Sequence, residues 1–179
     1  QEAGRGTPFY YYAYGGAVTE VEVNLLTGEH RIIRTDIVHD VGDSLSPDID
    51  LGQVEGAYVQ GVGWLTCEEP IYDRNGRFLT HSPSTYKIPT IGDVPDLFNV
   101  RLLKQAPQHN VIHGSKAVGE PPFVLGISVV TALRHAILSV NPDLKSVTLK
   151  MPCTPEAILR SISRQEGEQI EERDDIVVY

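Results

Sequence analysis

Cysteine is scarce in this chain of 179 residues, and the two that occur, Cys67 and Cys153, lie far apart. They form no CxxC pair, which argues against a cysteine-ligated iron–sulfur cluster and against a cysteine-based zinc site within the chain. Two isolated thiols are typical of a reducing compartment. We therefore expect a cytoplasmic protein in which both thiols serve as small buried hydrophobic side chains.

Basic residues and long uninterrupted apolar stretches are also scarce. The chain has 15 Lys and Arg against 24 Asp and Glu, a formal net charge of −9, which argues against binding nucleic acid or an anionic membrane through bulk charge. Its longest apolar stretch, residues 121–140, opens with two prolines and contains Arg134 and His135, so it predicts a buried core helix instead of a membrane span. The chain opens on Gln1 without an initiator Met, and we expect it to be part of a longer polypeptide.

Several common cofactor motifs are missing as well. The sequence has no GxGxxG, Walker-type or GxSxG motif, which argues against a Rossmann dinucleotide site and against an α/β-hydrolase. His109 and His113 are four residues apart, but the residues between them favour loop and strand over helix. We therefore predict no metal site made by side chains of this chain.

The apolar pattern predicts a sheet. Alternating segments at 16–24 and 31–38, rich in Val, Ile and Thr and separated by a turn signal at 26–29, indicate a β-hairpin. The remaining strands are expected in a second hairpin over 67–82, turning at 73–76, and at 97–104 and 146–150.

Three helices are expected to pack on this sheet. The first begins after Ser46, with Pro47 at its first position, and runs to about Gly63. The others are expected at 121–139, which is apolar nearly all round and should be buried, and at 154–163. The acidic residues 164–179 indicate a solvated tail or an edge segment. Together these elements predict an α+β fold, a mixed β-sheet built from hairpins with two to three packed helices.

The first helix has unusually many glycines. One face carries Gln53, Gly56, Gln60 and Gly63, and each glycine costs about 1 kcal/mol of helix stability relative to Ala. One interpretation is close packing of the helix on a sheet, with the glutamines satisfied locally. The other is a large polar ligand that lies close to the helix backbone and accepts hydrogen bonds from a glutamine amide.

A second candidate is the loop 114–122, GSKAVGEPP, which places one carboxylate directly before a predicted buried helix. Because a residue before proline is biased to extended backbone, Glu120 is expected to cap that helix in an extended conformation. It is either a plain helix cap or a partly desolvated carboxylate suited to act as a general base. Lys116 either takes part in an ion pair or is solvated in its loop. Solvation is the simpler interpretation.

Three segments in order resemble successive motifs of the xanthine dehydrogenase family, in the C-terminal part of its molybdopterin-binding subunit. They are 52–61 (GQVEGAYVQG), 83–89 (PSTYKIP) and 115–122 (SKAVGEPP), with weaker similarity at 19–30 and 40–42. The resemblance extends over about residues 6–160. It implies that 1–163 form the C-terminal portion of a molybdopterin-binding domain, followed by an acidic tail at 164–179.

The resemblance also implies an activity, the molybdenum-dependent hydroxylation of a carbon with oxygen taken from water. By motif position, Glu120 would be the general base, Gln53 would lie near the molybdopterin cofactor, and the backbone of Gly119 would border the same site. FAD and 2Fe-2S clusters are expected on other segments or subunits, and the upstream part of the molybdopterin subunit is the expected partner. The Glu120-Pro121-Pro122 pattern favours a purine such as hypoxanthine or xanthine as substrate.

Two alternatives stay open from the sequence. The chain lacks the upstream loops that cradle most of the cofactor, so it could instead be a folded interaction module without bound cofactor. It could also be part of an aldehyde- or carbon monoxide-oxidising relative. Whether the enzyme oxidises a purine, an aldehyde or carbon monoxide, the chain would carry only one wall of its site.

Overall fold

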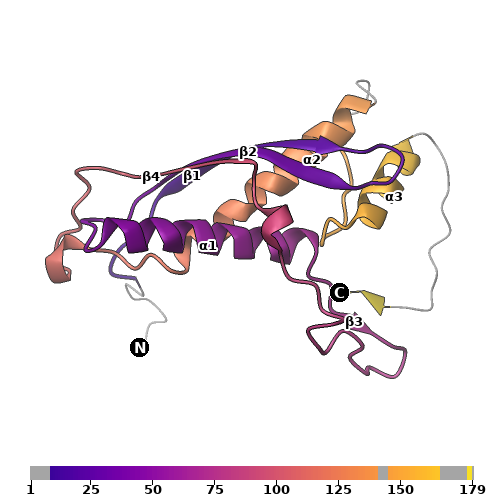
Figure 1. The fold of residues 1–179 in the computed structure, drawn as a ribbon, viewed down its shortest axis with the longest axis horizontal. Coiled ribbons are helices and arrows are strands. Elements are labelled where there is room, and N and C mark those ends of the chain that lie inside the picture. The colour runs from indigo at the N-terminus through magenta and orange to yellow at the C-terminus, as the bar shows by residue number, and fades with distance from the viewer. Residues whose placement is uncertain (1–8, 141–144, 166–176, 179) are drawn as a thin grey trace, which may run out of the picture.

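The computed structural model describes residues 9–140, 145–165 and 177–178, and its centre is a three-stranded sheet (Figure 1). The strands are β1 (Gly15–Val23), β2 (His30–His39) and β4 (Leu97–Leu102), in the order β1-β2-β4. β1 and β2 are antiparallel, whereas β2 and β4 are parallel, so the sheet is mixed. This confirms the first hairpin, the strand near 97–104 and the α+β class.

The turn between β1 and β2 depends on Gly28, which has φ +73°, a region that suits glycine. The backbone N–H of Gly28 donates to the carbonyl of Asn24 at 2.8 Å. A Cβ on Gly28 would lie 2.0 Å from the carbonyl oxygen of Pro155, the first residue of α3 (Pro155–Gln165). The same glycine therefore closes the hairpin and allows α3 to pack against it.

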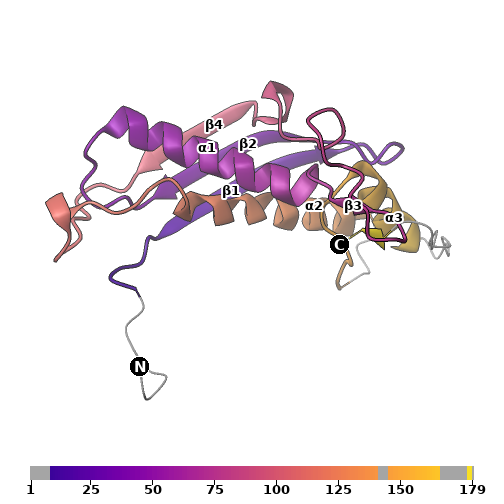
Figure 2. The same ribbon diagram turned by 90° about the horizontal axis from the view of Figure 1, so that it is seen from below.

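Helices α1 (Pro47–Thr66) and α2 (Ile127–Val140) cover one face of the sheet. Thr19 and Thr35 are opposite each other on β1 and β2, and both hydroxyls lie within hydrogen-bonding distance of the Tyr58 hydroxyl of α1, at 3.0 and 2.9 Å. The Ser128 hydroxyl of α2 lies 2.7 Å from that of Thr19. Both helices therefore meet the sheet on the same side, where α2 packs against β1 (Figure 2).

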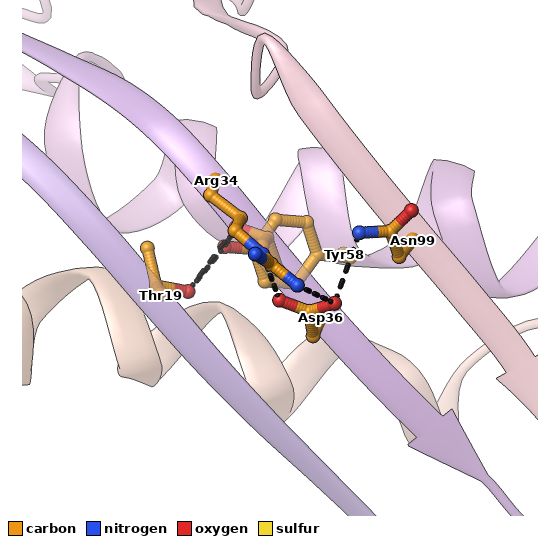
Figure 3. A network of polar contacts seen from close by, with 6 residues as sticks. Thr19, Arg34, Asp36, Tyr58 and Asn99 are labelled. Atoms are coloured by element: carbon orange, nitrogen blue, oxygen red, sulfur yellow. Dashed lines mark hydrogen bonds and ion pairs between the residues drawn. The ribbon is translucent and has the colours of Figure 1, made fainter.

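The opposite face of the sheet carries polar side chains on β2 and β4 (Figure 3). Asp36 of β2 accepts hydrogen bonds from Arg34 at 2.5 and 3.0 Å and from Asn99 of β4 at 2.9 Å. The Arg34 and Asn99 hydrogen bonds lower the pKa of the Asp36 carboxyl. Because these side chains are exposed to solvent, the pair contributes little to stability.

The hydrophobic core lies between the sheet and the helices. Its fully buried side chains come from β2, the three α-helices and the loops beside them: Ile37, Val41, Val54, Tyr58, Val129, Leu133, Ile137, Cys153 and Ile158. Burial raises the pKa of the Cys153 thiol to about 11, which fits its expected role as a small hydrophobic side chain. Cys67 is only half-buried.

The apolar stretch Pro121–Val140 has the length and composition to cross a membrane, but it contributes core residues such as Val129 and Leu133. The sequence expectation of a core helix is confirmed, whereas the expectation of burial all round is wrong, since Ile127 is 60% exposed. The stretch also begins as a separate 3-10 helix, η3 (Pro121–Gly126).

η3 touches α1 backbone to backbone. A Cβ on Gly61 of α1 would lie 2.1 Å from the carbonyl oxygen of Phe123, and a Cβ on Gly126 would lie 2.7 Å from the carbonyl carbon of Gly61. Close packing is thus found at Gly61, but against η3 and not against the sheet as expected. Gly63 is close-packed against a loop, where a Cβ would lie 2.3 Å from the Pro89 ring, and Gly56 has no atom within 4 Å of such a Cβ in the described part of the chain.

Two expected β segments differ in the structure. The second hairpin is present but shorter than expected: its first strand is β3 (Ile71–Tyr72), the N–H of Leu79 donates to the carbonyl of Ile71 at 2.8 Å, and at the expected turn the N–H of Gly76 donates to the carbonyl of Asp73. β3 also pairs with β5 (Val177–Val178), so this part of the acidic end forms an edge strand. The rest of that end, 166–176 and 179, lies outside the described residues.

The strand expected at 146–150 is wrong. Val147 is buried in the core, and the carbonyl of Thr148 accepts a hydrogen bond from the Ser161 hydroxyl of α3 at 2.9 Å. Side-chain bonding to a helix therefore takes the place of a strand ladder there. The helices end slightly later than expected, α1 at Thr66 and α3 at Gln165, and two further 3-10 turns are η1 (Ile91–Asp93) and η2 (Ile112–Gly114).

Two glycines of α1 provide a matched test of this packing. Gly61→Ala should lower the free energy of unfolding of the chain by on the order of 1–3 kcal/mol, because the new methyl group must displace backbone. Gly56→Ala should raise it by about 1 kcal/mol through helix propensity alone, since the site is open. Chemical denaturation of both variants checks this, and equal effects at the two positions would contradict the packing described.

Candidate functional site

Glu120 is the N-cap residue of η3, which confirms its expected place before the helix. The expected extended conformation is wrong, since Glu120 has φ −105° and ψ −41°. Its carbonyl turns inward to accept a hydrogen bond from the N–H of Phe123 at 3.0 Å, closing the first 3-10 turn. The carboxylate makes no capping hydrogen bond in the described chain and is exposed, so in this chain it is neither a side-chain cap nor a partly desolvated group.

Gln53 and Gly119 come together although they are far apart in the sequence. Gln53 lies on α1 with its side chain exposed, and a Cβ on Gly119 would lie 3.1 Å from the Gln53 Oε1 atom. The amide therefore lies directly against the backbone of Gly119, one residue before Glu120. All three residues that the sequence singled out thus lie at one end of the α1–η3 contact.

The surface of α1 beside Gln53 is open. A Cβ on Gly52 or Gly56 would meet no atom of the described residues within 4 Å, and Gln60 is exposed on the same helix. Bare backbone, amide groups and a nearby carboxylate form a surface onto which a bulky polar group can approach closely. The amide groups and the missing side chains are therefore chemically compatible with a polar cofactor such as a pterin.

The loop that carries Glu120 is held by Lys116, which the sequence favoured as a solvated lysine. That expectation is wrong, because the Lys116 ammonium is buried, pairs with the Asp40 carboxylate and donates to the carbonyl of Tyr12 at 2.8 Å. It also lies 5.4 Å from the centre of the Tyr14 ring. Asp40 in addition accepts a hydrogen bond from the N–H of Gly42 at 2.8 Å, which stabilises the turn after β2.

Sequence reasoning missed the pairing of Lys116 with Asp40 because 76 residues separate the two. The only signal was the polar Asp40 at the end of an apolar strand, and it does not identify the partner. Tyr11 also contacts this loop, since its hydroxyl accepts a hydrogen bond from the N–H of Ala117 at 2.9 Å.

The histidines form no metal site in the described residues, where no group of three or more His, Cys, Asp or Glu side chains is placed to hold a metal ion. His113 lies in η2 with φ 54°, so the segment from His109 to His113 is not an α-helix. His39 is buried beside Gly15, and burial lowers the pKa of its imidazole. It is therefore held neutral as a core residue.

The sequence profile of the molybdopterin cofactor-binding domain family matches residues 1–95, which include Gln53. Xanthine dehydrogenase/oxidase of Felis catus is 50% identical to this chain over 163 residues, and aldehyde oxidase 2 of Mus musculus is 46% identical over 158. These alignments cover 88% and 87% of the chain but only 12% of either relative. The chain thus spans about an eighth of the length of the curated relatives it matches.

Solved structures agree with the sequence comparisons. The crystal structure of quinoline 2-oxidoreductase from Pseudomonas putida 86 superimposes with a TM-score of 0.71 and 34% identity, covering 80% of this chain and 18% of that one. A match on both sequence and fold, over most of this chain and a small part of each relative, indicates common ancestry with one segment of a large enzyme. The chain therefore belongs to the molybdopterin cofactor-binding domain family, as the homologue of one segment of the molybdopterin-binding region of xanthine dehydrogenases.

Proposed function

We propose that this chain supplies the general base and one wall of the molybdopterin site in a molybdenum hydroxylase that acts on a purine. The observation that carries the proposal is the meeting of Gln53, Gly119 and Glu120 at one end of the α1–η3 contact. Packing alone explains Gly61 and Gly63, but it explains neither the exposed amide nor the exposed carboxylate.

Bound molybdopterin would supply the redox chemistry of the hydroxylation. Gln53 would hold it through amide hydrogen bonds, and the absence of a side chain at Gly119 would leave the loop backbone close to it. The open backbone at Gly52 and Gly56 would let the same group lie against α1. These residues form one side of a cradle, and we propose that the upstream part of the molybdopterin subunit forms the other.

Glu120 would accept the proton of the water-derived nucleophile. Its carboxylate is not engaged in capping η3, so it is available to a substrate-side group, and Pro121 and the buried Pro122 stiffen the chain directly after it. Closure of the site by the upstream part would remove water from around the carboxylate, which strengthens its interaction with a positioned proton. The reaction would thus depend on a base held by a rigid loop.

The remaining assignments follow from the size of the chain relative to its relatives. With about 12% of their length present, FAD and iron–sulfur groups would be carried by other segments or subunits. Val124 and Ile127, which follow Glu120 along η3 and into α2, are strongly exposed, as expected of a face that the upstream part covers. The two free thiols fit a cytoplasmic enzyme.

Replacing the proposed base gives the first test. In the complete enzyme, Glu120→Gln should keep the molybdenum content and lower turnover by roughly 10²–10⁴-fold, because the amide is similar in shape and cannot accept the proton. Glu22→Gln, at an exposed carboxylate on β1, serves as the matched control and should leave turnover unchanged. Metal analysis with steady-state kinetics checks this, and Glu120→Gln activity above about a tenth of wild type would identify a merely structural residue.

Gln53 gives a second test, with cofactor occupancy as its readout. Gln53→Ala should reduce molybdenum per protein in the complete enzyme while leaving the melting temperature nearly unchanged, because the amide is exposed on α1. Gln60→Ala, on the same helix about two turns further along, should have a smaller effect on molybdenum. A large fall in melting temperature with normal molybdenum content would show that Gln53 is a packing residue.

The substrate class can be tested separately. We expect a higher kcat/KM for xanthine than for a simple aromatic aldehyde, because a stiff Glu120-Pro121-Pro122 approach suits a flat, rigid ring held in one pose. The identities of 50% and 46% to a xanthine dehydrogenase/oxidase and an aldehyde oxidase are too close to decide this by themselves. A clear preference for the aldehyde would reject the purine and leave the role of Glu120 intact.

A further inference from the structure

The buried ion pair between Lys116 and Asp40 lies where three segments meet. Asp40 follows β2, Lys116 lies in the loop that leads to η3, and the carbonyl of Tyr12, which accepts from the Lys116 ammonium, precedes β1. Both charged side chains are only 5% exposed. The pair therefore ties the loop of Glu120 to the end of the central strand and to the segment that enters the sheet.

The backbone around this pair forms a second set of ties. The N–H of Lys116 donates to the carbonyl of Val41 at 2.9 Å, and the N–H of Asp43 donates to the carbonyl of Gly114 at 2.9 Å. Gly42 has φ +66°, and a Cβ there would lie 2.4 Å from the Gly114 oxygen. Residues 41–43 and 114–116 thus run side by side at contact distance, and only glycine fits at position 42.

The loop is fixed on both sides of the candidate base. On one side, Lys116 is buried and the N–H of Ala117 donates to the Tyr11 hydroxyl at 2.9 Å. On the other side, Pro122 is buried at the start of η3. Only the short segment 118–121 lies between these anchors, and it contains Gly119 and Glu120. The position of the carboxylate is thereby determined by where Lys116 is held.

We propose that Lys116 and Asp40 are positioning residues, which hold Gly119 and Glu120 against the Gln53 side of α1. A buried ion pair contributes little net stability, because desolvation of the two charges offsets their attraction, so stability alone does not account for placing one here. An ion pair does fix geometry, since the ammonium has directional partners in Asp40 and Tyr12. This proposal rests on the proposed role of Glu120 for its effect on turnover, but not for its effect on the loop.

The test is a double variant, Lys116→Met with Asp40→Asn, in the complete enzyme. Removing both charges together leaves no unpaired charge in the core. We expect faster hydrogen–deuterium exchange in residues 114–120, measured on cofactor-free protein, while α1 keeps its protection. After loading with cofactor, we expect kcat per bound molybdenum to fall about 10²-fold with KM little changed, because a small misplacement of a catalytic group has an effect of that order.

Asp36→Asn is the matched control, since it breaks an exposed ion pair on β2, the strand that Asp40 follows. It should change neither the exchange nor kcat. Should the double variant not fold, Asp40→Glu keeps both charges but displaces the ammonium, and we expect the same fall in kcat per molybdenum. Wild-type exchange at 114–120 together with wild-type kcat per molybdenum, in whichever variant folds, would overturn the proposal.

The two proposals fail in different ways. If Glu120→Gln stays active, the proposed base is wrong, and the exchange measurement still decides whether Lys116 and Asp40 hold the loop. If Glu120→Gln is inactive while the Lys116 and Asp40 variants keep full turnover per molybdenum, the base stands and the positioning role is rejected.

Discussion

The contact of α1 with η3 at Gly61 and Gly126 places both halves of the candidate site. Two glycines allow the two backbones to meet with no side chain between them. Gln53 lies on α1 about two turns before this contact, and Glu120 opens η3. The rings of Trp64 and Phe123, 5.4 Å apart, extend the contact on its other side. A larger residue at either glycine would separate the helices and, with them, the amide from the carboxylate.

The sheet provides the fixed base on which this contact rests. The Tyr58 hydroxyl joins α1 to Thr19 and Thr35 on adjacent strands, and Ser128 joins α2 to the same Thr19. Hydroxyls that bond one another are satisfied without water, so this polar group at the centre of the core orients both helices at low desolvation cost. α1 is therefore held in place by directional bonds as well as by apolar packing.

Two exposed surfaces of the chain differ in polarity. The sheet face opposite the helices carries exposed ion pairs such as Arg34 with Asp36, which suit contact with water. Val124 and Ile127, which follow Glu120 along η3 and into α2, are instead exposed apolar residues. Their exposure supports the proposal that other segments cover this part of the chain.

Local features of this protein were readable from its sequence. The first hairpin, the start of α1 after Ser46, and the place of Glu120 before a helix each depend on residues a few positions apart. Motif resemblance selected Gln53, Gly119 and Glu120 for the same reason, because each motif is a short continuous segment. The roles of these residues in cofactor binding and catalysis stay predictions, but the structure does bring them together.

Other features were decided only when distant segments came together. Gly56 and Gly61 look alike in the sequence, yet one faces open space and the other touches Phe123. Lys116 lies in a segment with the composition of a solvated loop. It is buried because Asp40, far away in the chain, supplies its counter-charge. Residues 146–150 alternate like a strand but bond to α3. Sequence patterns report local backbone preference, whereas burial and pairing depend on which surfaces the fold places in contact, and short-range preference carries no information about that.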